Sequence, residues 1–210
     1  VEKIGETWWK TGEPDLVPYF TSIMAAKPDA FIVCGGGATM TNSLKACKTT
    51  GIHEKIAVFM HTATDHAVLK PLGLEAAPEG VMGTMDYHFY YPETPANTAF
   101  VKTFQKVNGA PPGFPAFHAY ITAHFIAEAY KKAGAVDKEK FINALEGMVI
   151  DSPGGRVEMR ACDHQAVLPM YLGVTKKVPQ YNHLISGNIV TLTGNDVMPS
   201  CDEIMKARGK

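Results

Sequence analysis

The stretch that most constrains the fold runs from residue 29 to residue 47, where a strand-like run, a glycine turn and a helical pattern follow one another. The run over residues 30–34 is apolar, rich in Phe, Ile and Val, and bounded by turn residues, so it predicts a buried strand of a parallel sheet. Three glycines follow at positions 35–37, and helical spacing resumes from about Thr41. Gly51 stands where a glycine ends a helix.

The glycine turn is also a candidate ligand site. In open α/β sheets, ligands bind outside the carboxyl ends of the strands. Glycines let the backbone approach a ligand closely, and a helix N-terminus offers free N–H groups to an anion. The three glycines match neither G-x-G-x-x-G nor a phosphate loop. The stretch alone therefore leaves open the alternative of a tight connection that binds nothing.

The charge and the apolar runs of the sequence bear on whether the protein binds nucleic acids or membranes. The 210 residues carry a net charge of −1, with no basic block and no acidic tail, which gives no support to a nucleic-acid or membrane-surface role. No apolar run approaches the ~20 residues of a membrane span. We expect a globular protein without nucleic-acid partners.

The four cysteines divide into two pairs. Cys34 ends the first apolar run and Cys47 lies in the following helix, so we expect both to be buried thiols. Cys162 and Cys201 lie in polar surroundings near the C-terminus. A disulfide between them is a hypothesis that would require an oxidising compartment.

The first 86 residues predict alternating strands and helices. Strands are expected at residues 1–9, 30–34, 55–60 and 80–86, and helices at residues 15–26 and 41–50, the first of them capped by Asp15. This order is typical of an α/β fold with a mainly parallel sheet.

The rest of the chain begins with an aromatic, proline-bounded segment, residues 86–95, that predicts a crossing or a loop over a cleft. Helices are expected at residues 97–107, 116–133 and 137–146, and a last one, capped by Ser200 or Asp202, ends near residue 208. Residues 156–160 and 167–174 alternate like two antiparallel strands, and residues 189–192 like a short strand.

Several polar residues suggest chemistry, each beside a plainer alternative. His61, Asp65 and His66 combine three possible metal ligands, but they also fit a polar loop after a strand, in which His61 donates to a ligand. The dipeptide Asp163-His164 favours structural hydrogen bonds over acid–base work. No Gly-x-Ser-x-Gly motif is present.

Aromatic residues near position 90 suggest a ligand cleft. Asp86 stands beside the tyrosines at positions 87, 90 and 91. Tyrosine side chains supply apolar walls with polar tips, which suit a small ligand. Packing at a domain junction is the alternative for each of them.

Several short motifs, in their order and spacing, make the chain resemble a known family over nearly its whole length. They are Gly12-Glu13-Pro14-Asp15, Lys27-Pro28-Asp29-Ala30, the three glycines, Glu79-Gly80-Val81, residues 100–104, Ala119-Tyr120 with Ala133-Gly134, and Arg160-Ala161-Cys162-Asp163-His164-Gln165. With these motifs the chain resembles the branched-chain amino-acid type of periplasmic substrate-binding protein of ABC transporters.

The resemblance implies a type I periplasmic-binding-protein-like α/β fold, with a parallel sheet flanked by helices. It implies two hinged lobes that close on a small molecule and a membrane permease as partner, with neither a cofactor nor an enzymatic activity. Because family members are much longer, we expect a C-terminal fragment with one nearly complete lobe and part of a second. On this reading residues 1–86 belong to the second lobe, residues 87–150 to the first, and residues 151–210 return to the second.

The resemblance also implies ligand-binding positions. They are Gly36, Gly37, Ala38 and Thr39 in the glycine loop, His61 and Thr62 after the next strand, Asp86 and Tyr87 at a hinge crossing, and Pro115 and Phe117 at the start of the long helix. Two features depart from the amino-acid binders: the loop after residue 60 lacks their early acidic residue, and no aromatic residue lies near Gly37. Aromatic acids and small amides, which the family also carries, therefore stay open as ligands.

Three functional hypotheses follow. The first is a periplasmic solute-binding protein that captures a small polar organic ligand for an ABC importer. The second is an α/β enzyme that uses His61 and Asp86 as acid and base, and the third is a ligand-sensing domain of a receptor.

Overall fold

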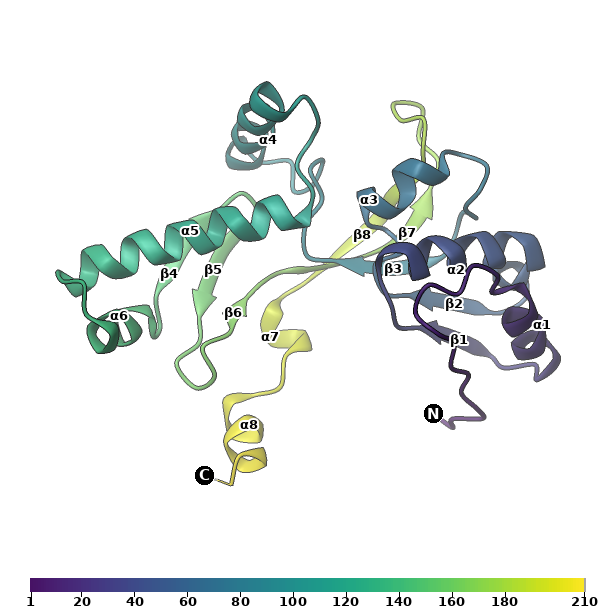
Figure 1. The fold of residues 1–210 in the computed structure, drawn as a ribbon, viewed down its shortest axis with the longest axis horizontal. Helices are drawn as coiled ribbons and strands as arrows, with labels where there is room; N and C mark the ends of the chain where they lie inside the picture. Colours follow the sequence, from purple (N-terminus) through teal and green to yellow (C-terminus); the bar gives the residue numbers. More distant parts are fainter. Residues whose placement is uncertain (210) are drawn as a thin grey trace. The chain divides into compact units, whose positions relative to one another are not determined.

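The computed structural model describes residues 1–209, and their contacts divide the chain into two compact units (Figure 1). Unit 1 comprises residues 1–85 and 172–190, and unit 2 comprises residues 86–171 and those after 190. The chain therefore passes from one unit to the other three times, after residues 85, 171 and 190.

Unit 1 is built on a five-stranded sheet in the order β1-β2-β3-β7-β8. Its strands are β1 (Ala30–Val33), β2 (Ala57–Met60), β3 (Met82–Met85), β7 (Met170–Lys176) and β8 (Ile185–Leu192). The first three run parallel, and β1 pairs with β2 from Ala30↔Ala57 to Val33↔Met60. The expected α/β architecture, with a mostly parallel sheet and flanking helices, is confirmed.

The helices of unit 1 include the two that were expected, and a local sequence signal marks one end of each. They are α1 (Val17–Ala25), α2 (Gly37–Thr50), the short α3 (His66–Leu69), and the 3-10 turns η1 (Ile52–Glu54) and η2 (Lys70–Leu72). The Asp15 carboxylate accepts the N–H of Val17 at the start of α1. Gly51, with a φ of 64°, ends α2 in the left-handed conformation. The second helix begins at Gly37, four residues earlier than expected.

One apolar core holds unit 1 together. Helices α1 and α2 pack against each other and contribute Phe20 and Leu44, while the strands contribute Val33, Val58 and Met60, all buried. Removing such side chains from water is the main stabilising contribution, roughly 1.5–3 kcal/mol for each large one.

Two expectations of burial in unit 1 were wrong, because the first apolar run forms an edge strand of the sheet and not an interior one. Strand β1 is parallel, as predicted, but it lies at the edge of the sheet and only Val33 is buried; Ile32 is 64% exposed. The thiol of Cys34, expected to be buried, is exposed just beyond it. Cys47 is buried as expected, and burial raises the pKa of its thiol to about 12.

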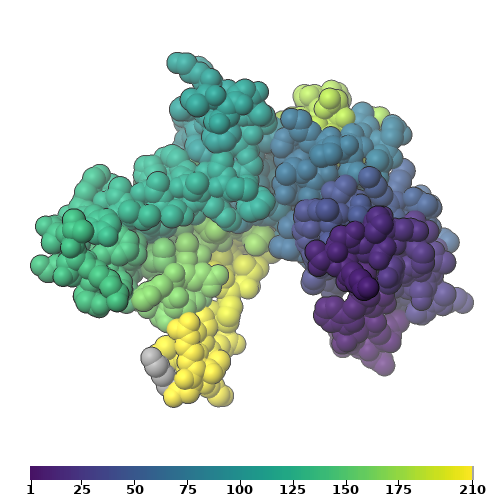
Figure 2. Space-filling view, in the orientation of Figure 1, coloured from purple at the N-terminus to yellow at the C-terminus, as the bar shows by residue number. Residues whose placement is uncertain are grey.

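Residues 1–9 do not form the expected strand. They lie on the surface of unit 1, at the purple end of the chain in Figure 2. The side chain of Trp8 is 82% exposed. Their apolar positions do not alternate with a period of two, so they lack the half-buried strand pattern. Trp9 instead packs edge-on against Tyr19, with ring centroids 5.8 Å apart, which attaches the segment to α1.

Unit 2 contains the expected helices α4 (Pro95–Asn108), α5 (Phe114–Ala133) and α6 (Lys138–Leu145), and the later α7 (Gly194–Val197) and α8 (Cys201–Ala207). The side chains of Thr94 and Asp137 cap α4 and α6. Helix α5 packs on α6 and on a small sheet, burying Phe117, Ile121 and Phe125.

The small sheet differs from the expected hairpin. Its order is β4-β5-β6, with β4 (Val149–Ser152), β5 (Gly155–Met159) and β6 (Ala166–Val167), all antiparallel. Strand β5 pairs with the unpredicted β4 on one side and with the two-residue β6 on the other, of which only Val167 belongs to the expected partner strand. Residues 170–174 join the sheet of unit 1 as part of β7, and β8 is longer than the predicted residues 189–192.

The division of the chain also differs from the expected one. Most of residues 151–210, which we expected to rejoin residues 1–86, share unit 2 with the long helix; only residues 172–190 lie in unit 1. The reason is the pairing just described: β4 packs against α5, and because β5 pairs with β4 it lies in unit 2 as well.

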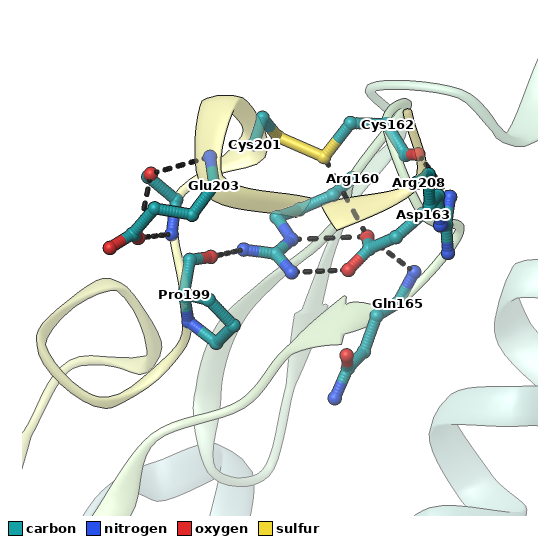
Figure 3. The surroundings of a disulfide bond; sticks show 9 residues. Arg160, Cys162, Asp163, Gln165, Pro199, Cys201, Glu203 and Arg208 are labelled. Atoms are coloured by element: carbon teal, nitrogen blue, oxygen red, sulfur yellow. Dashed lines mark hydrogen bonds and ion pairs between the residues drawn. A yellow bond between two sulfur atoms is a disulfide. The ribbon is translucent and has the colours of Figure 1, made fainter. Parts of the chain in front are cut away.

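A disulfide joins Cys162 to Cys201, as hypothesised, and fixes α8 to the loop after β5 (Figure 3). Beneath it the guanidinium of Arg160 forms a forked ion pair with Asp163 and donates to the carbonyl of Pro199 at 2.8 Å. This ion pair lowers the pKa of the Asp163 carboxyl. Arg208 donates to the carbonyl of Cys162 at 3.0 Å and closes the cluster from the far end of α8.

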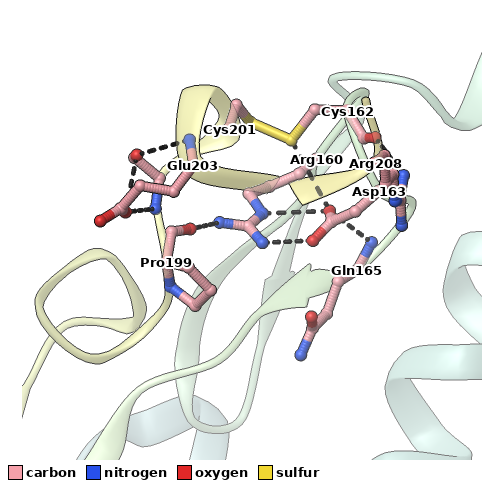
Figure 4. Close-up of polar contacts among 9 residues, drawn as sticks. Arg160, Cys162, Asp163, Gln165, Pro199, Cys201, Glu203 and Arg208 are labelled. Atoms are coloured by element: carbon pink, nitrogen blue, oxygen red, sulfur yellow. Dashed lines mark hydrogen bonds and ion pairs between the residues drawn. A yellow bond between two sulfur atoms is a disulfide. The ribbon is translucent and has the colours of Figure 1, made fainter. Parts of the chain in front are cut away.

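Helix α8 begins with a reciprocal cap, drawn in Figure 4 around Glu203. The backbone N–H of Ser200 donates to the Glu203 carboxylate at 2.7 Å, and the N–H of Glu203 donates to the Ser200 hydroxyl at 3.2 Å. Ser200 is therefore the cap, as one of the two expected residues. No helix within residues 1–209 has the length and apolar character needed to cross a membrane.

Two histidines join α3 to the loop before β8. Nδ1 of His66 lies 3.2 Å from Nε2 of His183, and the rings meet edge-on. Burial, followed by the nearby charges of His183 and Lys70, lowers the pKa of His66 to about 4.

Replacing both Cys162 and Cys201 by Ser is expected to destabilise the protein by about 4 kcal/mol, because the bridge closes a loop with a sequence separation of 39. Denaturant unfolding in the absence of reductant measures this difference. Replacing Cys34 by Ser, at an exposed free thiol, is the control. A double variant as stable as the control would contradict the stabilising role of the bridge.

The His66 pKa predicts a loss of stability in acid. Between about pH 6.5 and about pH 4 the unfolded chain binds a proton at His66 that the folded chain does not, so the free energy of unfolding falls as the pH is lowered through this window. His66→Gln removes that titration and is expected to flatten the fall. Thermal midpoints measured from pH 7.5 to pH 4.5 test it, and parallel curves for both proteins would show that His66 does not contribute.

Candidate functional site

The carboxyl ends of β1, β2 and β3 form the first candidate surface, within unit 1. Parallel neighbours end at the same edge of a sheet, so the segments that follow them come together there. The Thr62 hydroxyl donates to the carbonyl of Gly35 at 3.2 Å, and Nδ1 of His61 lies 3.1 Å from the Thr84 hydroxyl. We call residues 35–39, His61, Thr62 and Thr84 the strand-end surface.

The glycine loop gives this surface free backbone donors. Gly36 occupies the N-cap of α2 in extended conformation and has no side chain to accept from the first-turn N–H groups. Gly37 begins the helix with a φ of 56°, a left-handed conformation that glycine adopts without strain. Ala38 and Thr39 complete the first turn, and residues 36–38 are exposed. The positive end of the helix dipole therefore faces solvent with its N–H groups uncapped by Gly36.

The turn after β2 is held in an uncommon conformation. Thr62 has a φ of 64°, which is strained for a β-branched residue. Its bond to the Gly35 carbonyl stabilises this conformation and joins two loops of the strand-end surface. Strained residues of this kind cluster at ligand sites.

The three possible metal ligands of this loop take different partners. His61 bonds to Thr84, the Asp65 carboxylate accepts the N–H of Ala67 as the cap of α3, and His66 bonds to His183. Within residues 1–209 no group of three His, Cys, Asp or Glu side chains is placed to hold a metal ion.

The second candidate surface lies in unit 2, where the chain has just left β3. Oδ2 of Asp86 is 2.6 Å from Nε2 of His118 on α5, and the two side chains are 17% and 38% exposed. The hydrogen bond to Asp86 raises the pKa of His118, against the opposing effect of burial. Sequence reasoning included Asp86 but missed His118, because 32 residues separate the two and no local pattern joins them.

Tyr87 and Phe117, both expected at the site, pack in the core of unit 2. Their rings stack at 4.7 Å, and the Tyr87 hydroxyl donates to Oδ1 of Asn97 at 2.9 Å. Burial raises the pKa of the Tyr87 hydroxyl above its ordinary value, so the phenol stays neutral at physiological pH. Pro115 is exposed at the start of α5.

The other two tyrosines of the aromatic segment have different surroundings. The ring of Tyr91 meets that of Tyr171 edge-on at 5.0 Å, and its hydroxyl lies 3.0 Å from the Thr191 hydroxyl. Tyr90 stacks on His88 and lines an open hollow of about 640 Å³, together with Phe89, Pro92, Glu93 and the first turns of α4. Tyr90 was a candidate from the aromatic segment, but none of the ligand-binding positions that the family resemblance implies lines this hollow.

The histidine and aspartate after β5 have structural partners, as expected. Asp163 pairs with Arg160, and Nε2 of His164 lies 2.9 Å from Oε1 of Glu146 on the exposed surface.

Comparison with known proteins finds a family model that matches most of the chain. The family model described as "Periplasmic binding protein" matches residues 1–178. The "Leu/Ile/Val-binding protein homolog 4" of Brucella melitensis is 25% identical over an alignment of 178 residues, which covers 78% of this chain and 39% of that protein.

Solved structures share the fold. An amino acid ABC transporter substrate-binding protein from Pseudomonas fluorescens Pf-5 matches 96% of this chain with a TM-score of 0.78 and 25% identity. An ABC transporter solute-binding protein from Rhodopseudomonas palustris BisB5, in complex with 3,4-dihydroxybenzoic acid, matches 87% of it with a TM-score of 0.69 and 26% identity. The chain spans 53% and 50% of these two structures.

The Asp86–His118 bond predicts a measurable shift in titration. Asp86→Asn removes the carboxylate that raises the pKa of His118, so the pKa is expected to fall. Ring-proton NMR titration of His118 in both proteins measures the change. An unchanged midpoint in the variant would mean that the bond does not exist in solution.

Proposed function

We propose that this chain, which belongs to the periplasmic binding protein family, serves as the solute-binding component of an ABC importer. It captures a small polar organic ligand outside the cytoplasm and presents it to a membrane permease. The observation that carries the proposal is the strand-end surface, where exposed backbone donors and polar side chains meet at the carboxyl edge of a parallel sheet.

The strand-end surface suits the acceptor groups of a ligand. The first-turn N–H groups of α2 are donors, and the His61 ring and the Thr39 hydroxyl supply further polar contacts. A carboxylate, carbonyl or hydroxyl group fits this set.

The connectivity supports a mechanism of closure. Three chain crossings link units 1 and 2, and a few residues at such crossings can absorb the backbone rotation of a hinge. On the family resemblance we propose a closure of this kind. Binding would then stabilise the closed form, which the permease recognises.

The ligand class that we propose is an amino acid or an aromatic carboxylic acid. The relatives point both ways, since the Brucella protein is named for leucine, isoleucine and valine and the Rhodopseudomonas structure contains 3,4-dihydroxybenzoic acid. The role is one of binding without turnover, so the ligand is expected to be recovered unchanged.

A thermal-shift panel tests the proposal. Amino acids, aromatic carboxylates and their amides are added singly, and a ligand at 100 times its dissociation constant is expected to stabilise the protein by roughly 2.7 kcal/mol. One chemical class should raise the unfolding midpoint, with the compound recovered intact by mass spectrometry. A folded protein whose midpoint no compound raises would contradict the proposal, and conversion of the compound to a product would favour an enzyme.

A variant ties the shift to the strand-end surface. His61→Ala is expected to weaken binding about tenfold, the loss typical of one hydrogen bond to a ligand. The matched control is His124→Ala, at an exposed histidine on α5 whose ring lies tilted against that of Tyr120. Equal affinities in the two variants would remove His61 from the site.

A further inference from the structure

The pair formed by Asp86 and His118 differs from an ordinary surface ion pair. Asp86 directly follows β3, at one of the three crossings, and its carboxylate is 17% exposed. The Glu146–His164 pair in the same unit has a longer contact, 2.9 Å against 2.6 Å, and both its side chains are more exposed, at 39% and 54%. The first pair is thus the more shielded from water, where charge-assisted bonds are stronger.

The imidazole of His118 is oriented with one nitrogen toward Asp86. Nε2 makes that bond, and within residues 1–209 the structure gives Nδ1, on the other side of the ring, no hydrogen-bond partner. The rings of Phe114 and Phe117 flank the imidazole, with centroids 5.5 Å and 6.0 Å away. Nδ1 therefore lies at the edge of an apolar surface, and the side chain is still 38% exposed.

The chemistry of the pair favours an anion as its partner. A carboxylate at Nε2 stabilises the doubly protonated ring, in which Nδ1–H is also a donor. A donor of that kind binds an oxygen acceptor, and binds a negatively charged one most strongly. A ligand ammonium group would instead have to compete with His118 for Asp86.

We propose that His118 receives the carboxylate of the bound ligand through Nδ1–H, and that Asp86 acts as a positioning residue that holds the ring in place. The inference deepens the proposed function and rests on it, because it names a residue of unit 2 that would select the ligand by its charge. The protein should then select an organic acid over the neutral amide of the same shape. The flanking phenylalanines favour acids whose carboxyl group adjoins an apolar body.

Two acid–amide pairs test this selection by isothermal titration calorimetry on the protein. One pair is 3,4-dihydroxybenzoate and 3,4-dihydroxybenzamide, and the other is leucine and leucinamide. The unaltered protein is expected to bind one acid at least tenfold more tightly than its amide. His118→Gln should weaken binding of that acid at least tenfold and leave the affinity for the amide within about twofold. Asp86→Asn should reduce the same preference by a smaller factor.

Controls separate recognition from folding. His164→Gln in the exposed pair with Glu146 should leave the acid–amide ratio unchanged, and thermal unfolding establishes that each variant is folded. His118→Asn provides a second substitution at the same position. Equal weakening of acid and amide by both His118 variants would assign the residue a structural role and overturn the inference, with the proposed function intact. A folded, unaltered protein that binds none of the four compounds or the wider panel would overturn the proposed function itself.

Discussion

Parallel pairing of β1, β2 and β3 is the interaction on which the architecture of unit 1 depends. It requires each strand to be followed by a crossover, and these crossovers supply α2 and α3, whose apolar faces close the core over Val33, Val58 and Met60. The same pairing lines up the carboxyl ends of the strands. The glycine loop, His61 and Thr84 meet for this reason alone, although nearly fifty residues of sequence separate the first from the last.

The elements that could be predicted from sequence are those with local signals. Gly51, Gly109 and Gly134 each end a helix with a positive φ, and Ser200 begins one through a reciprocal cap, so the patterns of these helices were nearly sufficient. The Cys162–Cys201 bridge was also foreseen, since both cysteines stand apart from any apolar pattern. The strand-end surface was predicted from the rule that ligands of open α/β sheets bind outside the carboxyl ends of the strands, and the glycine turn marked one of those ends.

The sequence could not predict which strands and side chains, far apart along the chain, contact one another in the fold. An apolar run such as residues 30–34 has the same pattern at an edge as in an interior, so the exposure of Ile32 and Cys34 depends on which neighbours the chain provides. The pairing of β5 with β4 and the bond of Asp86 to His118 join residues through tertiary packing, and neither leaves a trace in local composition. Tyr87 was expected to bind ligand but packs in a core. An aromatic residue has the same local sequence pattern in a cleft and in a core, and only the stacking on Phe117 distinguishes the two.

The insertion of most of unit 2 between β3 and β7 has a consequence for how the protein folds. The N–H of Gly80 donates to the carbonyl of Thr175 at 2.8 Å, and the Thr175 hydroxyl accepts from the N–H of Val81 across 94 positions in sequence. Closing so long a loop in a disordered chain costs conformational entropy and slows the search for the contact. Near the two ends of the insertion, the ring of His88 stacks on that of Tyr171 with centroids 6.0 Å apart, so these ends lie together within unit 2. An insertion that folds first thus shortens the loop that the sheet must close. On a ribosome, residues 172–176 would emerge only after nearly all of that insertion, and this order favours such a sequence of events.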